Sequence, residues 1–235
     1  MYLGDQHTMI LLLLACTASE KDTSVSNEPT VSVSGRVVEL FGGIGVERVD
    51  VCLKDSSLCA QTDSDGRYDL DVPTQAEHIL LLNGTDLVGG TVAFTAQEDS
   101  IELANVSLLS PAIVEGQFSA LDQTWEPNTG ALAFSISNGV NGDGINVPNI
   151  SVAIEPSSGD GPFYSSALGL PVDDLTATSD NGGGVMINLP EDIYQLNYGN
   201  LPEDCSLLLG WGSALEHQIP IVADRVSFAR VTCPE

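Results

Sequence analysis

The sequence predicts an all-β protein built from two tandem β-sandwich domains. Short runs of β-branched residues alternate with clusters of Gly, Pro, Asn and Asp, which is the spacing of strands and turns. No long stretch repeats its apolar residues at the helical period. One strand pattern also occurs twice along the chain. The 235 residues, of which 43% are hydrophobic, suffice for two cores of ordinary size.

The repeat joins two pairs of segments. "GVERVDVCL" (residues 45–53) matches "NVPNISVAI" (146–154), and "TDSDGRYDLDVP" (62–73) matches "TSDNGGGVMINLP" (178–190). Because strand side chains alternate between faces, the extra glycine of the second copy must be absorbed in a turn or a bulge at residues 182–184. The residues expected on one face are Val49, Val51, Leu53, Tyr68, Leu70 and Val72 in the first copy, and Ile150, Val152, Ile154, Val185, Ile187 and Leu189 in the second.

The repeat also sets the domain boundaries. We expect the first sandwich over residues 30–108 and the second over residues 130–235. Residues 109–129 form a connector, with room for one strand around residues 113–118.

The motifs of the first domain resemble a known family. "VSGRVVE", "GVERVDVCL" and "TDSDGRYDLDVP" are similar to the pattern of a carboxypeptidase regulatory-like domain, a transthyretin-like (prealbumin-like, Greek-key) β-sandwich often found in bacterial surface proteins. The second domain resembles it more loosely, through "LAFSIS", "TSDNGG" and "NLPEDIYQL", and carries an insert at residues 155–175. The resemblance implies a rigid accessory unit, and some relatives bind carbohydrate. It implies no reaction, because these motifs mark strands and turns.

The first residues predict export and lipid anchoring. The apolar run at residues 9–15 is too short to span a bilayer and is typical of a secretory signal. "LLAC" at residues 13–16 resembles a bacterial lipoprotein signal, although no Lys or Arg precedes it. We therefore expect a signal peptide over residues 1–15, acyl chains on Cys16, a flexible tether over residues 16–29, and a location at the outer membrane or cell surface.

The charge is strongly acidic and excludes one class of partner. The chain has 33 Asp and Glu against 7 Lys and Arg, and residues 68–224 contain no Lys or Arg. Such a surface repels nucleic acid phosphates. It either keeps the protein soluble or attracts cations such as calcium or a basic partner.

Four cysteines besides Cys16 predict two disulfides in an exported protein. A hairpin centred on residues 55–56 sets Cys52 opposite Cys59, within disulfide range. Cys205 then pairs with Cys233. The spacing lacks the CxxC pairs of a zinc site.

Acidic residues before glycine suggest either calcium loops or turns. With Gly66 at the sixth position of a calcium loop, the first and twelfth positions are Gln61 and Val72, so the end ligands are missing. Turn chemistry, in which Asp or Asn accepts local backbone bonds, explains the pattern better. Calcium is kept as the alternative, with further ligands from a distant loop. The candidate ligands are Asp63, Asp65, Asn141 and Asp143.

Nothing in the sequence predicts an enzyme or another cofactor. The three histidines, His7, His78 and His217, lack the spacing of a zinc peptidase. No nucleophile motif or phosphate-binding glycine loop is present in the sequence.

Three aromatic residues in loop context are candidate ligand-binding groups. Trp125, Tyr164 and Trp211 are able to stack on a sugar or anchor a partner if exposed, and otherwise cap the sandwich cores. The sequence thus favours a non-catalytic, lipid-anchored surface module for structure or adhesion, whose partner is a polysaccharide or another surface protein. The alternatives are a carbohydrate-binding accessory lipoprotein and a calcium-stabilised surface protein.

Overall fold

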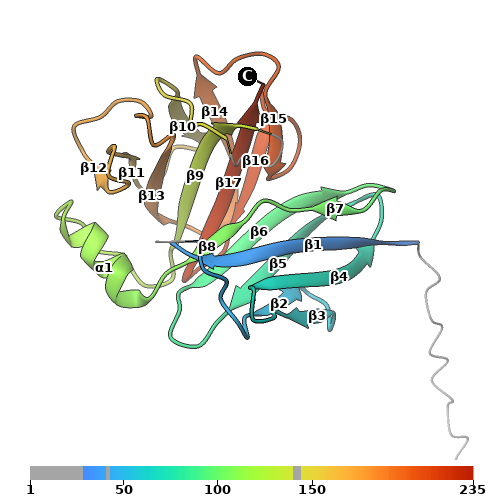
Figure 1. The fold of residues 1–235 in the computed structure, drawn as a ribbon. Helices are drawn as coiled ribbons and strands as arrows, with labels where there is room; N and C mark the ends of the chain where they lie inside the picture. The colour runs from blue at the N-terminus through green and yellow to red at the C-terminus, as the bar shows by residue number, and fades with distance from the viewer. Residues whose placement is uncertain (1–28, 41–42, 140–143, 235) are drawn as a thin grey trace, which may run out of the picture.

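The protein is almost entirely β-structure, which confirms the predicted class. The computed structural model describes residues 29–40, 43–139 and 144–234. Three sheets and one short helix make up this part of the chain, as Figure 1 shows.

The first sheet belongs to the first half of the chain. It is four-stranded, with β1 paired antiparallel to β4 and parallel to β7 and β8. Its strands are β1 (Thr30–Glu39), β4 (Arg67–Pro73), β7 (Ile101–Glu102) and β8 (Val106–Leu108).

The central sheet has ten strands and draws on both halves of the chain. In spatial order they are β12 (Pro171–Val172), β11 (Asp160–Ser165), β13 (Gly183–Leu189), β9 (Gly130–Asn138), β17 (Arg225–Cys233), β6 (Gly89–Ala96), β5 (Ala76–Asn83), β2 (Asp50–Leu53) and β3 (Cys59–Gln61), with β15 (Ser206–Leu209) also paired to β17. The third sheet is three-stranded and consists of β10 (Ser151–Glu155), β14 (Asp192–Gly199) and β16 (His217–Ile221).

The two outer sheets cover opposite faces of the central sheet. On β6, Val92 and Phe94 belong to the core formed with β1 and β4, whereas Ala93 belongs to the core formed with β14 and β16. Successive residues of a strand point to opposite faces, so the two cores lie on either side of the same sheet.

The two halves repeat one topology, as the sequence predicts. The hydroxyl of Thr62 accepts the N–H of Val49 at 2.9 Å, and that of Thr178 accepts the N–H of Ile150 at 3.0 Å. Each hydroxyl also donates to the carbonyl three residues earlier in the partner segment. The pairings of β1 with β4 and β8 recur as those of β9 with β13 and β17.

The extra residue of the second copy lies elsewhere than predicted. Gly66 and Gly182 are equivalent, because both have positive φ (75° and 68°) and both carbonyls accept a first-strand N–H. The register of β13 against β9 then shifts between Met186 and Leu189. These two residues face the core, while Val185 and Ile187 face the opposite side, so their predicted assignment to the core face is wrong.

The connector contains a helix where a strand was expected. Helix α1 (Pro111–Ser119) starts after the extended Ser110, with proline at its first turn, where the missing N–H is not needed. Val114 and Phe118, one helical turn apart, are buried against the central sheet. In the described part of the chain no helix is long and apolar enough to span a membrane.

Both predicted disulfides are confirmed. Cys52–Cys59 closes the β2–β3 hairpin, and Cys205–Cys233 ties the residue before β15 to the end of β17; the Cα–Cα distance is 4.1 Å in each. Each bridge therefore fastens neighbouring strands of the central sheet.

The two halves are fused at β17. Its first four residues pair in parallel with the first four of β6, and its other edge pairs with β9. Arg225 reinforces this junction: its guanidinium donates to the carbonyls of Leu82 and Gly90 at 3.2 and 3.3 Å, and to Asn83 Oδ1 at 2.6 Å.

Replacing Arg225 by Gln is expected to lower the free energy of unfolding by about 2 kcal/mol, because charge-assisted bonds between the halves are lost. Urea unfolding would measure the change. Arg48→Gln is the matched control, since it removes the same charge from an exposed pair with Glu47 and should cost less than about 1 kcal/mol. Equal midpoints for the two variants would show that the Arg225 bonds do not stabilise the junction.

Candidate functional site

The candidate site is a groove of about 360 Å³ on the central sheet. Its floor is formed by β13, β9 and β17 on the face that the three-stranded sheet does not cover. Leu132 and Ile136 of β9 point into the core, so the alternating Ala133 and Ser135 face the groove. These short side chains leave the depth of the groove open.

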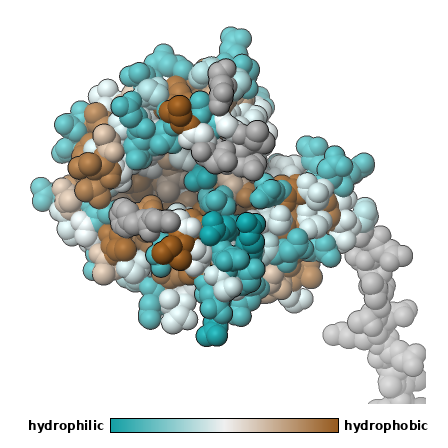
Figure 2. Space-filling view, viewed as in Figure 1, coloured by the Kyte–Doolittle hydropathy of each residue, from teal (hydrophilic) through white to brown (hydrophobic). Residues whose placement is uncertain are grey.

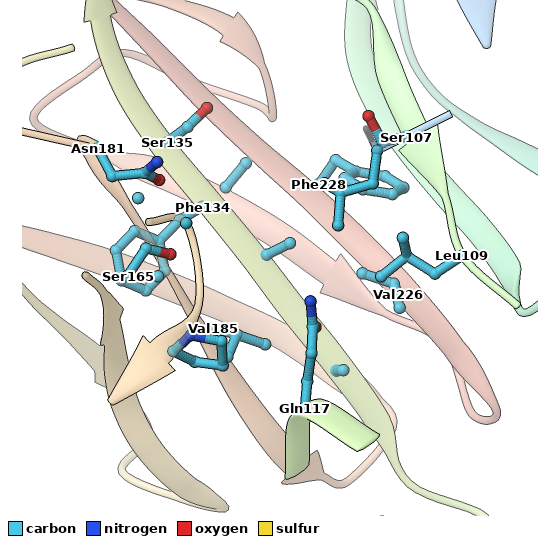
Figure 3. A pocket seen from close by; sticks show the side chains of 18 of the residues that line it. Ser107, Leu109, Gln117, Phe134, Ser135, Ser165, Asn181, Val185, Val226 and Phe228 are labelled. Carbon is cyan, nitrogen blue, oxygen red and sulfur yellow. The ribbon is translucent and has the colours of Figure 1, made fainter. Parts of the chain in front are cut away.

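Three segments form the walls. They are helix α1, the chain around β8, and the turn between β11 and β12. Figure 3 shows Gln117 pointing from α1 toward the sheet, with Ser107 and Leu109 on the β8 side and Ser165 on the opposite side. In the space-filling view of Figure 2 the groove is a recess in the viewed face, bordered by hydrophobic surface.

The groove is apolar at one end and polar at the other. Val226 and Leu109 lie toward the end where α1 packs, whereas Ser135 and Asn181 lie toward the other end (Figure 3). This division arises because β9 and β17 run parallel. Along both strands the side chains on the groove face change from apolar to polar at the same level.

Arg230 supplies the charge at the polar end. It stands opposite Ser135 in the β17–β9 ladder, and its Nε donates to Ser135 Oγ at 3.1 Å. Burial lowers the pKa of Arg230 below its ordinary value. No Asp or Glu appears among the described residues that line the groove. Across the described ranges the only ion pair is the exposed Arg48–Glu47 pair, so Arg230 has no carboxylate partner there.

Sequence reasoning missed Arg230, although a signal was available. In "DRVSFARVTC" the alternation of β17 places Arg230 on the same face as Val226 and Phe228. A cation on an otherwise apolar strand face, in a chain with few cations, marks a candidate anion-binding position.

The predicted Asp63 site has the geometry of a turn. Asp63 Oδ1 accepts the N–H groups of Asp65 and Arg67, both at 2.9 Å, which is the local bonding expected for a turn aspartate. Within the described residues no group of three or more His, Cys, Asp or Glu side chains is arranged to hold a metal ion. Asn141 and Asp143 lie outside the described residues, as does Cys16.

Two of the three candidate aromatic residues are buried, which agrees with the alternative that they cap the sandwich cores and leaves them no exposed stacking surface. Trp211 is 6% exposed and donates to the carbonyl of His78 at 3.2 Å. Tyr164 is 2% exposed, and its hydroxyl accepts the N–H of Val152 at 2.9 Å. Trp125 is half-buried and packs edge-on against Phe118 at 6.2 Å, so it supports the α1 wall of the groove.

The two described histidines lie apart from the groove. His78 Nε2 is 2.7 Å from the carbonyl of Pro73. His217 is fully buried, with Nδ1 2.7 Å from the hydroxyl of Tyr198, while Nε2 has no hydrogen-bond partner in the described part of the chain. Burial lowers the pKa of His217 to about 4.

Comparison with known proteins gives distant likenesses. No family model matches the chain, and no curated protein matches it. Among solved structures it is similar to a minor pilin of Streptococcus agalactiae, with 12% identity over 87% of this chain and 96% of that one, and a TM-score of 0.30. It is also similar to the shaft pilin SpaA of Lactobacillus rhamnosus GG, with 10% identity over 87% and 98%, and a TM-score of 0.28.

A third similar structure is the TIE protein of Bacillus anthracis, with 11% identity and a TM-score of 0.27. The match covers 86% of this chain but 34% of that protein, so this chain spans about a third of its length. These likenesses are too distant to assign a family, and the carboxypeptidase regulatory-like resemblance stays a prediction.

Replacing Asp63 by Ala is expected to destabilise the protein by about 1 kcal/mol, because two backbone N–H groups lose their acceptor. The melting temperatures of the parent and the variant should both be unchanged by millimolar calcium or by a chelator. A calcium-dependent rise that disappears in Asp63→Ala would contradict the turn assignment and support a metal site.

Acidification is expected to destabilise the fold through His217. The unfolded side chain binds a proton near pH 6.5, whereas burial holds the folded pKa at about 4. The contribution of the neutral His217 to the free energy of unfolding is therefore fully present well above pH 6.5. It is lost as the pH falls from about 6.5 to 4, by about 3 kcal/mol at most. Urea unfolding across this range should show a shallower pH slope in His217→Asn. Parallel slopes for the two proteins would contradict the assignment.

Proposed function

We propose that the protein is an exported, non-catalytic surface module for structure or adhesion, tethered to a membrane by acyl chains on Cys16. The observation that carries the proposal is the shared central sheet. Because β17 pairs with strands of both halves, the two sandwiches form one rigid unit rather than two domains joined by a flexible linker. A rigid body of this kind can hold a bound partner at a fixed position and bear mechanical force at a surface.

The placement of the groove supports a role in binding. Strand β1 begins at the end of the molecule remote from α1 (Figure 1). A tether that precedes residue 30 would hold that end at the membrane and leave the groove facing outward.

The lining of the groove favours binding over reaction. It combines apolar and neutral hydrogen-bonding side chains with one cation, and the described lining residues include no His, Cys, Asp or Glu. General acid, general base and thiol chemistry use those residue types. A net charge of -26 disfavours nucleic acid, so the partner is another surface protein or a polysaccharide.

The carbohydrate alternative loses its original support. It relied on exposed aromatic planes, and the rings of Trp211 and Tyr164 are buried. A protein partner therefore fits the described surface better than a stacked sugar.

The anchoring is tested by replacing Cys16 with Ser in a bacterial host. The parent protein should incorporate labelled fatty acid and sediment with membranes, whereas Cys16→Ser should do neither, because the acyl chains supply the membrane affinity. Cell fractionation and label incorporation measure both effects. A parent protein that is unlabelled and released into the soluble fraction would overturn the anchoring proposal.

A further inference from the structure

We infer that the groove binds the carboxyl terminus of an apolar peptide segment, with the carboxylate held by Arg230. The assignment rests on the proposed binding role of the groove. It does not depend on acylation of Cys16, so the two proposals fail in different experiments.

The charge of the groove argues for an anionic ligand. The sequence contains 33 Asp and Glu, yet Arg230 is the single charged residue among the described residues that line the groove. A half-buried guanidinium without an opposite charge is costly. A carboxylate that enters the groove removes this cost by pairing with it.

The hydrogen bonding of Arg230 leaves room for such a ligand. Among the described residues its guanidinium has one acceptor, Ser135 Oγ, which is bound by Nε. Within the described part of the chain the two terminal amino groups have no acceptor, and they suit the two oxygens of a carboxylate in a bidentate pair. The bond from Nε to Ser135 fixes the plane of the guanidinium beforehand.

Attraction at Arg230 is compatible with the acidic surface of the protein. At physiological ionic strength exposed charges are screened beyond roughly 8 Å, whereas a partly buried charge is screened much less. Within the groove the nearby cation therefore outweighs the more distant acidic residues. The general negative charge instead disfavours ligands that carry many negative charges.

The remainder of the lining selects a peptide among carboxylates. Val114, Phe118 and Val226 offer an apolar surface at the α1 end. Gln117 and Asn181 project into the groove from the walls and can bond peptide N–H and C=O groups (Figure 3). Apart from its carboxylate, a fatty acid has no polar groups that could bond the amides of Gln117 and Asn181. A sugar acid has no apolar side chain that could fill the α1 end of the groove. The volume of about 360 Å³ limits the bound segment to a few residues.

The proposal is tested by calorimetric titration of the full chain with N-acetylated tripeptides that end in Val, Leu, Ile or Phe. Each peptide is compared as the free acid and as the C-terminal amide. We expect at least one free acid to bind with a Kd of about 1 mM or lower, and its amide to bind at least about tenfold more weakly. This comparison uses the unaltered protein, so it does not depend on the folding of a variant.

Variants then locate the carboxylate. Arg230→Gln should raise the Kd of the free-acid peptide by more than about tenfold and leave the weak binding of the amide peptide unchanged. Arg230→Lys should give an intermediate affinity, because it keeps the charge and loses the bidentate geometry. Arg48→Gln removes the same formal charge from an exposed position and should bind like the parent.

Three outcomes would overturn the proposal. The first is that no free acid binds. The second is that acid and amide bind equally, or that Arg48→Gln weakens binding as much as Arg230→Gln. The third is that galacturonate or octanoate, titrated in parallel, binds more tightly than every peptide.

Discussion

The pairing of β17 with β6 on one edge and β9 on the other is the constraint on which the architecture depends. Each half of the chain has a complete sandwich topology, but the edge strand β6 of the first half is covered by a strand of the second. This pairing satisfies backbone groups that an isolated edge would leave open to other chains. Arg225, one of the seven Lys and Arg residues of the chain, donates hydrogen bonds across the same junction.

The groove follows from that fusion. Because the two cores lie on opposite faces of the central sheet, the outer face of β13, β9 and β17 lies beside the first sandwich without a sheet of its own to cover it. Helix α1 covers one end of this face through Val114 and Phe118. The remaining area, with small side chains and Arg230, stays open as the groove.

The sequence predicts strands well because their signals are local. Alternating residues such as Val49 and Ile150, and a cysteine pair opposed across a hairpin, need no distant partner to be recognised. Their repetition also makes the common topology predictable.

Features that depend on distant contacts were not predictable. The local signals at "PAIVEGQFS" are weak: a proline suits the first turn of a helix, but Val114 and Phe118 are buried only because the central sheet lies beneath them. The bulge at Asn188 has a similar origin: its side chain donates to the carbonyl of Thr124 and to Asp160 and accepts the N–H of Glu126, all far away in sequence. The groove forms only where α1, the chain around β8 and the turn between β11 and β12 meet. Of its lining residues, the sequence alone therefore marks Arg230 at most.

The way β1 enters the fold bears on how the molecule withstands traction. A pull delivered through the residues before Thr30 runs along β1, which is held to β4 over seven consecutive residue pairs. Antiparallel bonds stand perpendicular to their strands. Such a pull therefore loads these bonds in shear, all at once, so β1 resists extension best when the force acts along its own axis.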